Sequence, residues 1–94
     1  MTIGELADTV NEELEIIRFP QQEGRFMAHF PNMEIKDKLD SIMLAGSFGN
    51  GKTPTEAIND YISQIRSKWG IFNAGGAEKR KEIFIPNTLE SFKE

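Results

Sequence analysis

The chain has 94 residues, 38% of them hydrophobic and 28% charged, with a formal net charge of −4 and no cysteine. This length suits one domain with a modest core, and the lack of cysteine excludes disulfides, thiolate metal sites and a cysteine nucleophile. The acidic balance disfavours non-specific binding to nucleic acid, although a local basic patch can override it. No apolar run approaches a membrane span and the first residues do not resemble a signal peptide, so we expect a cytoplasmic protein.

Residues 1–13 have a capping-box spacing from Thr2 to Glu5, followed by Leu6 and Val10 at helical intervals. This pattern predicts a short helix. Gly4 and the acidic residues that follow weaken a helix, so an arm that orders only against a partner is the alternative.

Residues 14–19 and 25–30 alternate in side-chain character and predict a hairpin of two strands, joined by a turn at 21–24. We expect Phe26 and Phe30 of the second strand to face the main helix.

The opposite face of this hairpin carries Met27 and His29, and we assign Ile16 to it as well. A single helix covers only one face of an antiparallel sheet, so this face should stay open. Because it is too apolar for water over a contiguous area, we expect it to form an interface, with a dimer as the favoured self-association.

Shorter apolar segments follow. We predict an optional extended piece at 33–36, a third strand at 41–48, a brief strand at 71–73 and a last strand at 82–85. Leu89 and Phe92 are candidate anchors of the C-terminal tail.

The main helix is predicted to begin at Pro54. Thr53 is a suitable N-cap, proline fits the first helical position, and Glu56 completes a second capping-box spacing. Gly70 is expected to supply the left-handed residue that ends the helix. One apolar stripe recurs at spacings of three and four: Ile58, Tyr61, Ile62, Ile65 and Trp69.

These elements predict an α+β fold of β-β-β-α-β order, in which an antiparallel sheet of three to four strands packs on one main helix. Residues 14–86 would form this single domain, with a short helix or arm at 1–13 and a tail at 87–94.

Gly46, Gly51, Lys52 and Thr53 match the phosphate-loop pattern G-x-x-x-x-G-K-[ST]. In a working loop the lysine and threonine lie in the first turn of a helix that follows a strand of a parallel sheet. Pro54 instead makes Thr53 the cap, and the predicted sheet is antiparallel. We interpret the match as a strand-to-helix turn.

No enzyme site is visible in the sequence. His29 is the only histidine, no Ser, Asp and His set has triad spacing, and no second histidine offers a metal site. We therefore expect no catalytic residue, no cofactor and no metal.

A basic set and one aromatic residue form the second candidate surface. If the helix end and the following hairpin tip converge, they form a patch for phosphate or an acidic partner; the alternative is a helix end and a solvated loop. Trp69 is either a core residue, which we favour, or an interface anchor. The basic residues are Arg66, Lys68, Lys79, Arg80 and Lys81.

Two segments, EGRFMAHFPNMEI and GNGKTPTEAINDYISQI, resemble the HicB-like family, in which a strand G-x-(Y/F)-x-A-x-F-P-(D/N) precedes a helix start G-(D/K)-T-x-x-E-A-(I/L). The chain is also similar to small phage and prophage proteins. The resemblance implies a domain related to the double-stranded-RNA-binding fold that acts as an antitoxin by masking a ribonuclease toxin, often as an oligomer. The matched positions are Gly24, Phe26, Ala28, Phe30, Pro31, Asn32, Gly51, Thr53, Glu56, Ala57 and Ile58.

Together these observations predict a non-enzymatic protein-interaction module, encoded by a phage or mobile element, that inhibits or masks a protein partner. The alternative is a nucleic-acid-binding domain that uses the basic patch.

Overall fold

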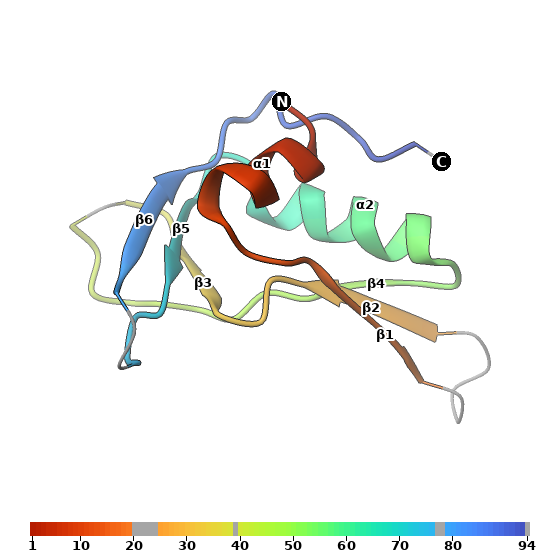
Figure 1. The fold of residues 1–94 in the computed structure, drawn as a ribbon, viewed down its shortest axis with the longest axis horizontal. Coiled ribbons are helices and arrows are strands. Elements are labelled where there is room, and N and C mark those ends of the chain that lie inside the picture. Colours follow the sequence, from red (N-terminus) through yellow and green to blue (C-terminus); the bar gives the residue numbers. More distant parts are fainter. Residues whose placement is uncertain (20–24, 39, 77–78, 94) are drawn as a thin grey trace.

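The computed structural model describes residues 1–19, 25–38, 40–76 and 79–93, which form two helices and six strands (Figure 1). The predicted α+β class, with antiparallel strands, one main helix and a short N-terminal helix, is confirmed. The turn predicted at 21–24 lies outside the described residues. In chain order the elements are α1 (Ile3–Val10), β1 (Glu15–Phe19), β2 (Arg25–His29), β3 (Met33–Lys36), β4 (Gly49–Gly51), α2 (Pro54–Ile65), β5 (Trp69–Phe72) and β6 (Lys81–Phe84).

The strands are divided between two antiparallel sheets, where the sequence suggested one. Sheet A has the order β1-β2-β4 and sheet B the order β3-β5-β6. The chain passes from β2 to β3 through a turn at Pro31 and Asn32, closed by a hydrogen bond from Met33 N–H to the Phe30 carbonyl at 3.1 Å. Because proline has no N–H for a ladder, the turn splits one long strand into two short ones.

The third strand predicted at 41–48 is wrong. In that segment Ala45 alone pairs, in a bridge to Ile35 with N···O distances of 2.8 and 3.0 Å, and the next paired residue is Gly49 in β4. The segment crosses the bend between the sheets. It therefore meets β3 at one residue before it turns to pair with β2.

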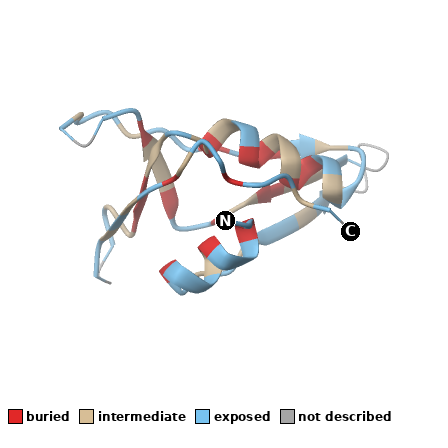
Figure 2. Cartoon of the chain, turned by 90° about the horizontal axis from the view of Figure 1, so that it is seen from above, coloured by how far each residue is buried: buried red, intermediate tan, exposed pale blue. Residues whose placement is uncertain are grey.

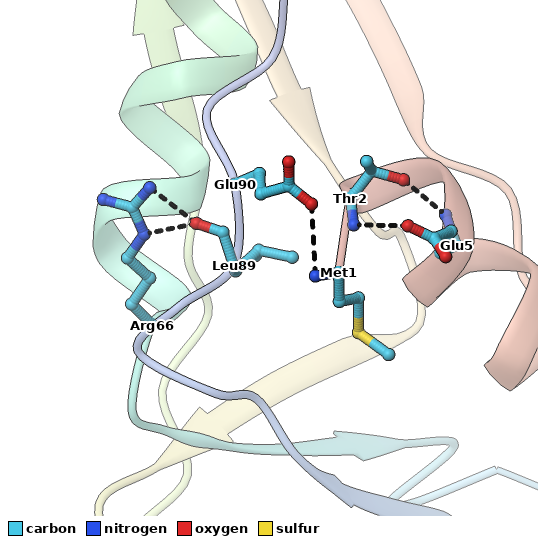
Figure 3. Close-up of polar contacts among 6 residues, drawn as sticks. All are labelled: Met1, Thr2, Glu5, Arg66, Leu89 and Glu90. Atoms are coloured by element: carbon cyan, nitrogen blue, oxygen red, sulfur yellow. Dashed lines mark hydrogen bonds and ion pairs between the residues drawn. The ribbon is translucent and has the colours of Figure 1, made fainter.

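Helix α1 is a folded part of the core. Thr2 caps it in the predicted way: Glu5 N–H donates to Thr2 Oγ1 at 3.1 Å, and Thr2 N–H donates to the Glu5 carboxylate at 3.0 Å (Figure 3). The bond from the Thr2 backbone lowers the pKa of Glu5. Leu6 and Val10 are buried.

Helix α2 begins at Pro54 as predicted, and Thr53 Oγ1 accepts the Glu56 N–H at 3.1 Å. The buried residues of its predicted stripe are Ile58, Tyr61, Ile62 and Ile65. They face the core that lies between the helices and the sheets; buried positions gather on the inner sides of these elements, while the outer loops are exposed (Figure 2).

The end of α2 differs from the prediction. Ser67, with φ of 63°, is the left-handed residue, and its N–H donates to the Ile85 carbonyl at 2.8 Å. Gly70 lies inside β5, where a Cβ would stand 2.7 Å from Met33 Sδ. Trp69 is the first residue of β5 and not part of the helical stripe. The long-range bond to Ile85 favours an earlier helix end than the glycine suggested.

The C-terminal tail runs back over the helices. Leu89 is fully buried and Phe92 packs against the core, so both predicted anchors are confirmed. Arg66 donates through Nε and Nη2 to the Leu89 carbonyl at 2.9 and 2.6 Å. Glu90 binds the Met1 ammonium at 3.2 Å, which ties the tail to the start of the chain (Figure 3).

Candidate functional site

Helix α2 covers one face of sheet A, and none of the described segments forms a layer on the other face (Figure 1). The pairing register places Ile17 opposite Met27, and Phe19 and His29 follow on the same side in the neighbouring rows. Ile17, Phe19, Met27 and His29 are all half-buried, and Phe48, next to His29, is 46% exposed. We call these five residues the open face.

Ile16 does not belong to the open face, contrary to the expectation from sequence. It pairs with Ala28, which is buried beneath α2, so Ile16 points toward the helix side and is 43% exposed at the sheet edge. Ile16 and Ile17 are equally apolar. Alternation along the strand therefore could not show which one faces the helix, and register decides it.

His29 is the polar member of the open face. Its ring lies 5.1 Å from the Phe48 ring, its Nε2 is 4.0 Å from Glu15 Oε1, and its side chain is 14% exposed. Among the described residues, Nε2 has no hydrogen-bond partner. The side chain therefore contributes mostly apolar contact to this surface, and Nε2 itself is buried.

The phosphate-loop match is a tightly packed turn. The Asn50 N–H donates to Asp60 Oδ2 at 2.8 Å, and the Lys52 N–H donates to Glu56 Oε2 at 3.2 Å. A bound phosphate would need backbone N–H donors of this kind, and here two carboxylates already accept their hydrogen bonds. Asn50 lies within β4 and Lys52 directly follows it, and β4 pairs antiparallel with β2.

Two of the candidate basic residues make internal contacts at the end of α2. Arg66 binds the Leu89 carbonyl, as described above, and Lys68 Nζ is bonded to the Asp37 carboxylate. This bond lowers the pKa of Asp37. Both side chains thus have roles within the fold.

The other three basic residues lie around the far end of the β5–β6 hairpin. Lys81 pairs with Phe72 across the sheet, and its Nζ donates to the Val10 carbonyl at 2.5 Å and lies 3.4 Å from Glu12 Oε2. Lys79 and Arg80 are exposed. The five cations are therefore spread over both ends of the hairpin and do not converge.

Trp69 lies on sheet B, half-buried, with its ring 5.4 Å from that of Phe84. Phe84 is 48% exposed, so the pair forms a small aromatic surface of its own.

A second exposed apolar position was not recognised from the sequence. Ile42 is 95% exposed and Met43 80% exposed, in the segment between β3 and β4. The sequence placed them in a strand because the run from Ile42 to Leu44 is apolar. The sequence feature that argues against a half-buried strand here is the lack of alternation between apolar and polar residues within that run.

Among the described residues, no three His, Asp or Glu side chains are arranged so that they could hold a metal ion. Within the same part of the chain, no helix is long and apolar enough to cross a membrane.

The fold and its open face define a small α+β protein with an uncovered sheet surface. Searches with the chain against protein-family models, curated proteins and solved structures gave no match. The HicB-like resemblance therefore stays a prediction.

Proposed function

We propose that this protein is a non-enzymatic interaction module that binds a protein partner through the open face and thereby inhibits or masks it. The observation that carries the proposal is the uncovered face of sheet A, where Ile17, Phe19, Met27 and Phe48 keep apolar area in contact with water. When a partner removes such area from water, the free energy of binding becomes more favourable by about 25 cal/mol per Å² buried.

The nature of the partner is inferred from the sequence motifs. The HicB-like strand and helix-start motifs favour an antitoxin-like or host-directed inhibitor of phage or mobile-element origin that acts in the cytoplasm. A symmetric dimer through the same face is the form of self-association we propose, because an isologous interface needs one self-complementary patch.

The test compares affinity capture from lysate of the source cells by the wild-type chain and by Met27→Glu, with the captured proteins quantified by mass spectrometry. Burying the new carboxylate against an apolar partner is costly, so we expect capture of the specific partner to fall at least about tenfold. Size-exclusion light scattering on both proteins reports the dimer.

Ile42→Glu is the matched control, since it makes the same change at an exposed apolar residue outside the open face. Melting curves verify that both variants fold. Equal capture by wild type and Met27→Glu would contradict the proposal, and loss of capture by Ile42→Glu alone would move the interface to the β3–β4 segment.

A further inference from the structure

A groove runs along the edge of sheet A, between α1 and the start of β1. It has a volume of about 870 Å³, and its lining includes the apolar residues Leu14, Ile16 and Phe30. The other lining residues come from the end of α1, from the segment that joins α1 to β1 and from the turn at Pro31 and Asn32. We call it the edge groove.

The edge groove is negatively charged. Its described lining includes four acidic residues and neither lysine nor arginine; Asp8 and Glu13 are exposed, Glu12 contacts Lys81, and the carboxylate of Glu15 lies on the open-face side of β1, beside His29. The last turn of α1, which also lines the groove, contains no basic residue. The negative end of the helix dipole therefore adds to the field of the carboxylates.

The groove reaches the start of β1, at Glu15 and Ile16, and among the described residues no strand pairs with the outer edge of β1. β1 is an outer strand of sheet A, and on its outer side alternate backbone N–H and C=O groups point away from β2. Ile16 lies at this edge and is 43% exposed. An uncovered edge of this kind is a template for pairing with another extended chain.

We infer that the edge groove and β1 bind a basic extended segment of the partner protein, which adds to sheet A as a fourth strand. Side chains of an added strand alternate between the two faces of the sheet. One set would lie over Ile16 and reach the groove carboxylates, where lysine or arginine is favoured. The other set would extend the open face beside Ile17 and Phe19, where apolar residues are favoured.

This inference rests on the proposed function, because it specifies the chemistry of the partner. It explains why one module would offer an acidic groove and an apolar face on the two sides of one strand. Main-chain bonds to β1 would provide affinity, and the alternating side chains would provide specificity.

The probe is a fluorescent peptide of roughly eight residues, the length of an ordinary strand, that alternates lysine and valine. Its control alternates glutamate and valine. Fluorescence anisotropy with the full chain should show binding of the lysine peptide that weakens as salt is raised, and at least about tenfold weaker binding of the glutamate peptide.

Charge reversal in the groove provides the matched protein variants. Glu13→Lys should weaken binding of the lysine peptide about tenfold at low salt, because it replaces one attraction by a repulsion. Asp40→Lys makes the same charge change at an exposed residue away from the groove and should alter affinity less than about twofold. Asp8→Lys repeats the test from the α1 side.

Strand addition has its own readout. Hydrogen exchange of the β1 backbone amides should slow on binding of the lysine peptide, since outward N–H groups gain partners. Unchanged exchange in β1, equal binding of both peptides, or equal affinities for Glu13→Lys and Asp40→Lys would each overturn the inference. If the lysine peptide does not bind while affinity capture still depends on Met27, this inference is wrong and the proposed function stands.

Discussion

Gly49 and Gly51 are the residues that allow α2 to lie directly on β4. A Cβ on Gly49 would stand 2.1 Å from the Ala57 carbonyl oxygen, and one on Gly51 would stand 2.5 Å from the Ala57 nitrogen. These neighbours are backbone atoms and cannot rotate away. Helix packing thus explains Gly51, one of the two glycines of the phosphate-loop pattern, whereas a Cβ on the other, Gly46, would meet only the Phe48 ring, at 3.7 Å.

Gly49→Ala should lower the free energy of unfolding by at least about 2 kcal/mol, because the added methyl forces β4 and α2 apart. Urea denaturation measures this change. Gly75→Ala is the control, since a Cβ there has no neighbour within 4 Å. Equal stability of the two variants would show that α2 does not pack as closely as described.

Tyr61 links α2 to Phe30, the residue that follows β2, from inside the core. Its hydroxyl oxygen accepts the Phe30 N–H at 3.0 Å, and burial raises the pKa of Tyr61 to about 12. An unfolded tyrosine ionises near pH 10. Between about pH 10 and 12 the unfolded chain therefore releases a proton that the folded chain retains, and stability falls as pH rises.

We expect this tyrosine to remove about 2 to 3 kcal/mol of stability between pH 10 and 12, at about 1.4 kcal/mol per pH unit. Denaturation of wild type and Tyr61→Phe at each pH isolates the effect, because the chain has one tyrosine. The variant should be less stable at neutral pH, where the Phe30 N–H loses its acceptor, and its alkaline loss should be smaller. If the free energies of unfolding of the two proteins fell in parallel with rising pH, the alkaline loss could not be assigned to Tyr61.

At the scale of elements, the C-terminal tail is held by the end of α2. The Arg66 guanidinium forms two bonds to one carbonyl, and the side chain of Leu89 fills the core beneath it. This arrangement connects a residue at the helix C-cap to a segment that has no strand or helix of its own.

Arg66→Ala should loosen the tail and lower stability by about 1 to 2 kcal/mol, because the Leu89 carbonyl loses a charged donor. Hydrogen exchange should quicken in residues 86–93 before it does so in α2. Arg80→Ala, at an exposed residue directly before β6, removes the same side chain without these bonds and should leave the tail protected. If the tail exchanges equally fast in both variants, Arg66 does not hold it.

Local signals predicted the helix starts and the tail anchors. The caps at Thr2 and Thr53 depend on residues within one turn, and Leu89 stands out as an apolar residue in a polar tail. The candidate residues Met27 and His29 lie on the open face for the same reason, since alternation within β2 is a local property.

Features that depend on distant partners were not predictable. Pro31 interrupts the strand locally, but the sheet that β3 joins follows from its pairing with β5, far along the chain. The early end of α2 at Ser67 follows from a bond to Ile85. The edge groove exists only because α1 folds back beside β1, so its carboxylates appeared in the sequence as an ordinary acidic linker.

At the scale of the whole molecule, the distribution of charge favours the protein-binding proposal over the nucleic-acid-binding alternative. The acidic edge groove lies between α1 and β1, while the five candidate basic side chains are divided between the two ends of the β5–β6 hairpin, several of them in internal contacts. These five residues therefore form no continuous track for a phosphate backbone.

We expect no retarded band when the protein is mixed with double-stranded RNA or DNA at about 50 mM salt, where phosphate contacts are strong. Electrophoretic mobility with a basic RNA-binding protein as the positive control makes the measurement. A complex whose affinity falls steeply as salt is raised, and which Lys79→Glu weakens, would instead favour the nucleic-acid alternative.

The interleaving of the two sheets along the chain has a consequence for synthesis. Sheet A and its covering helix use strands that are complete by the end of α2, yet β3, made between β2 and β4, belongs to sheet B. On the ribosome β3 must therefore wait, with one bridge to Ala45, until β5 and β6 emerge. The nascent chain would hold a finished sheet beside an unpaired strand, so it is most prone to mispairing just before its last strands appear.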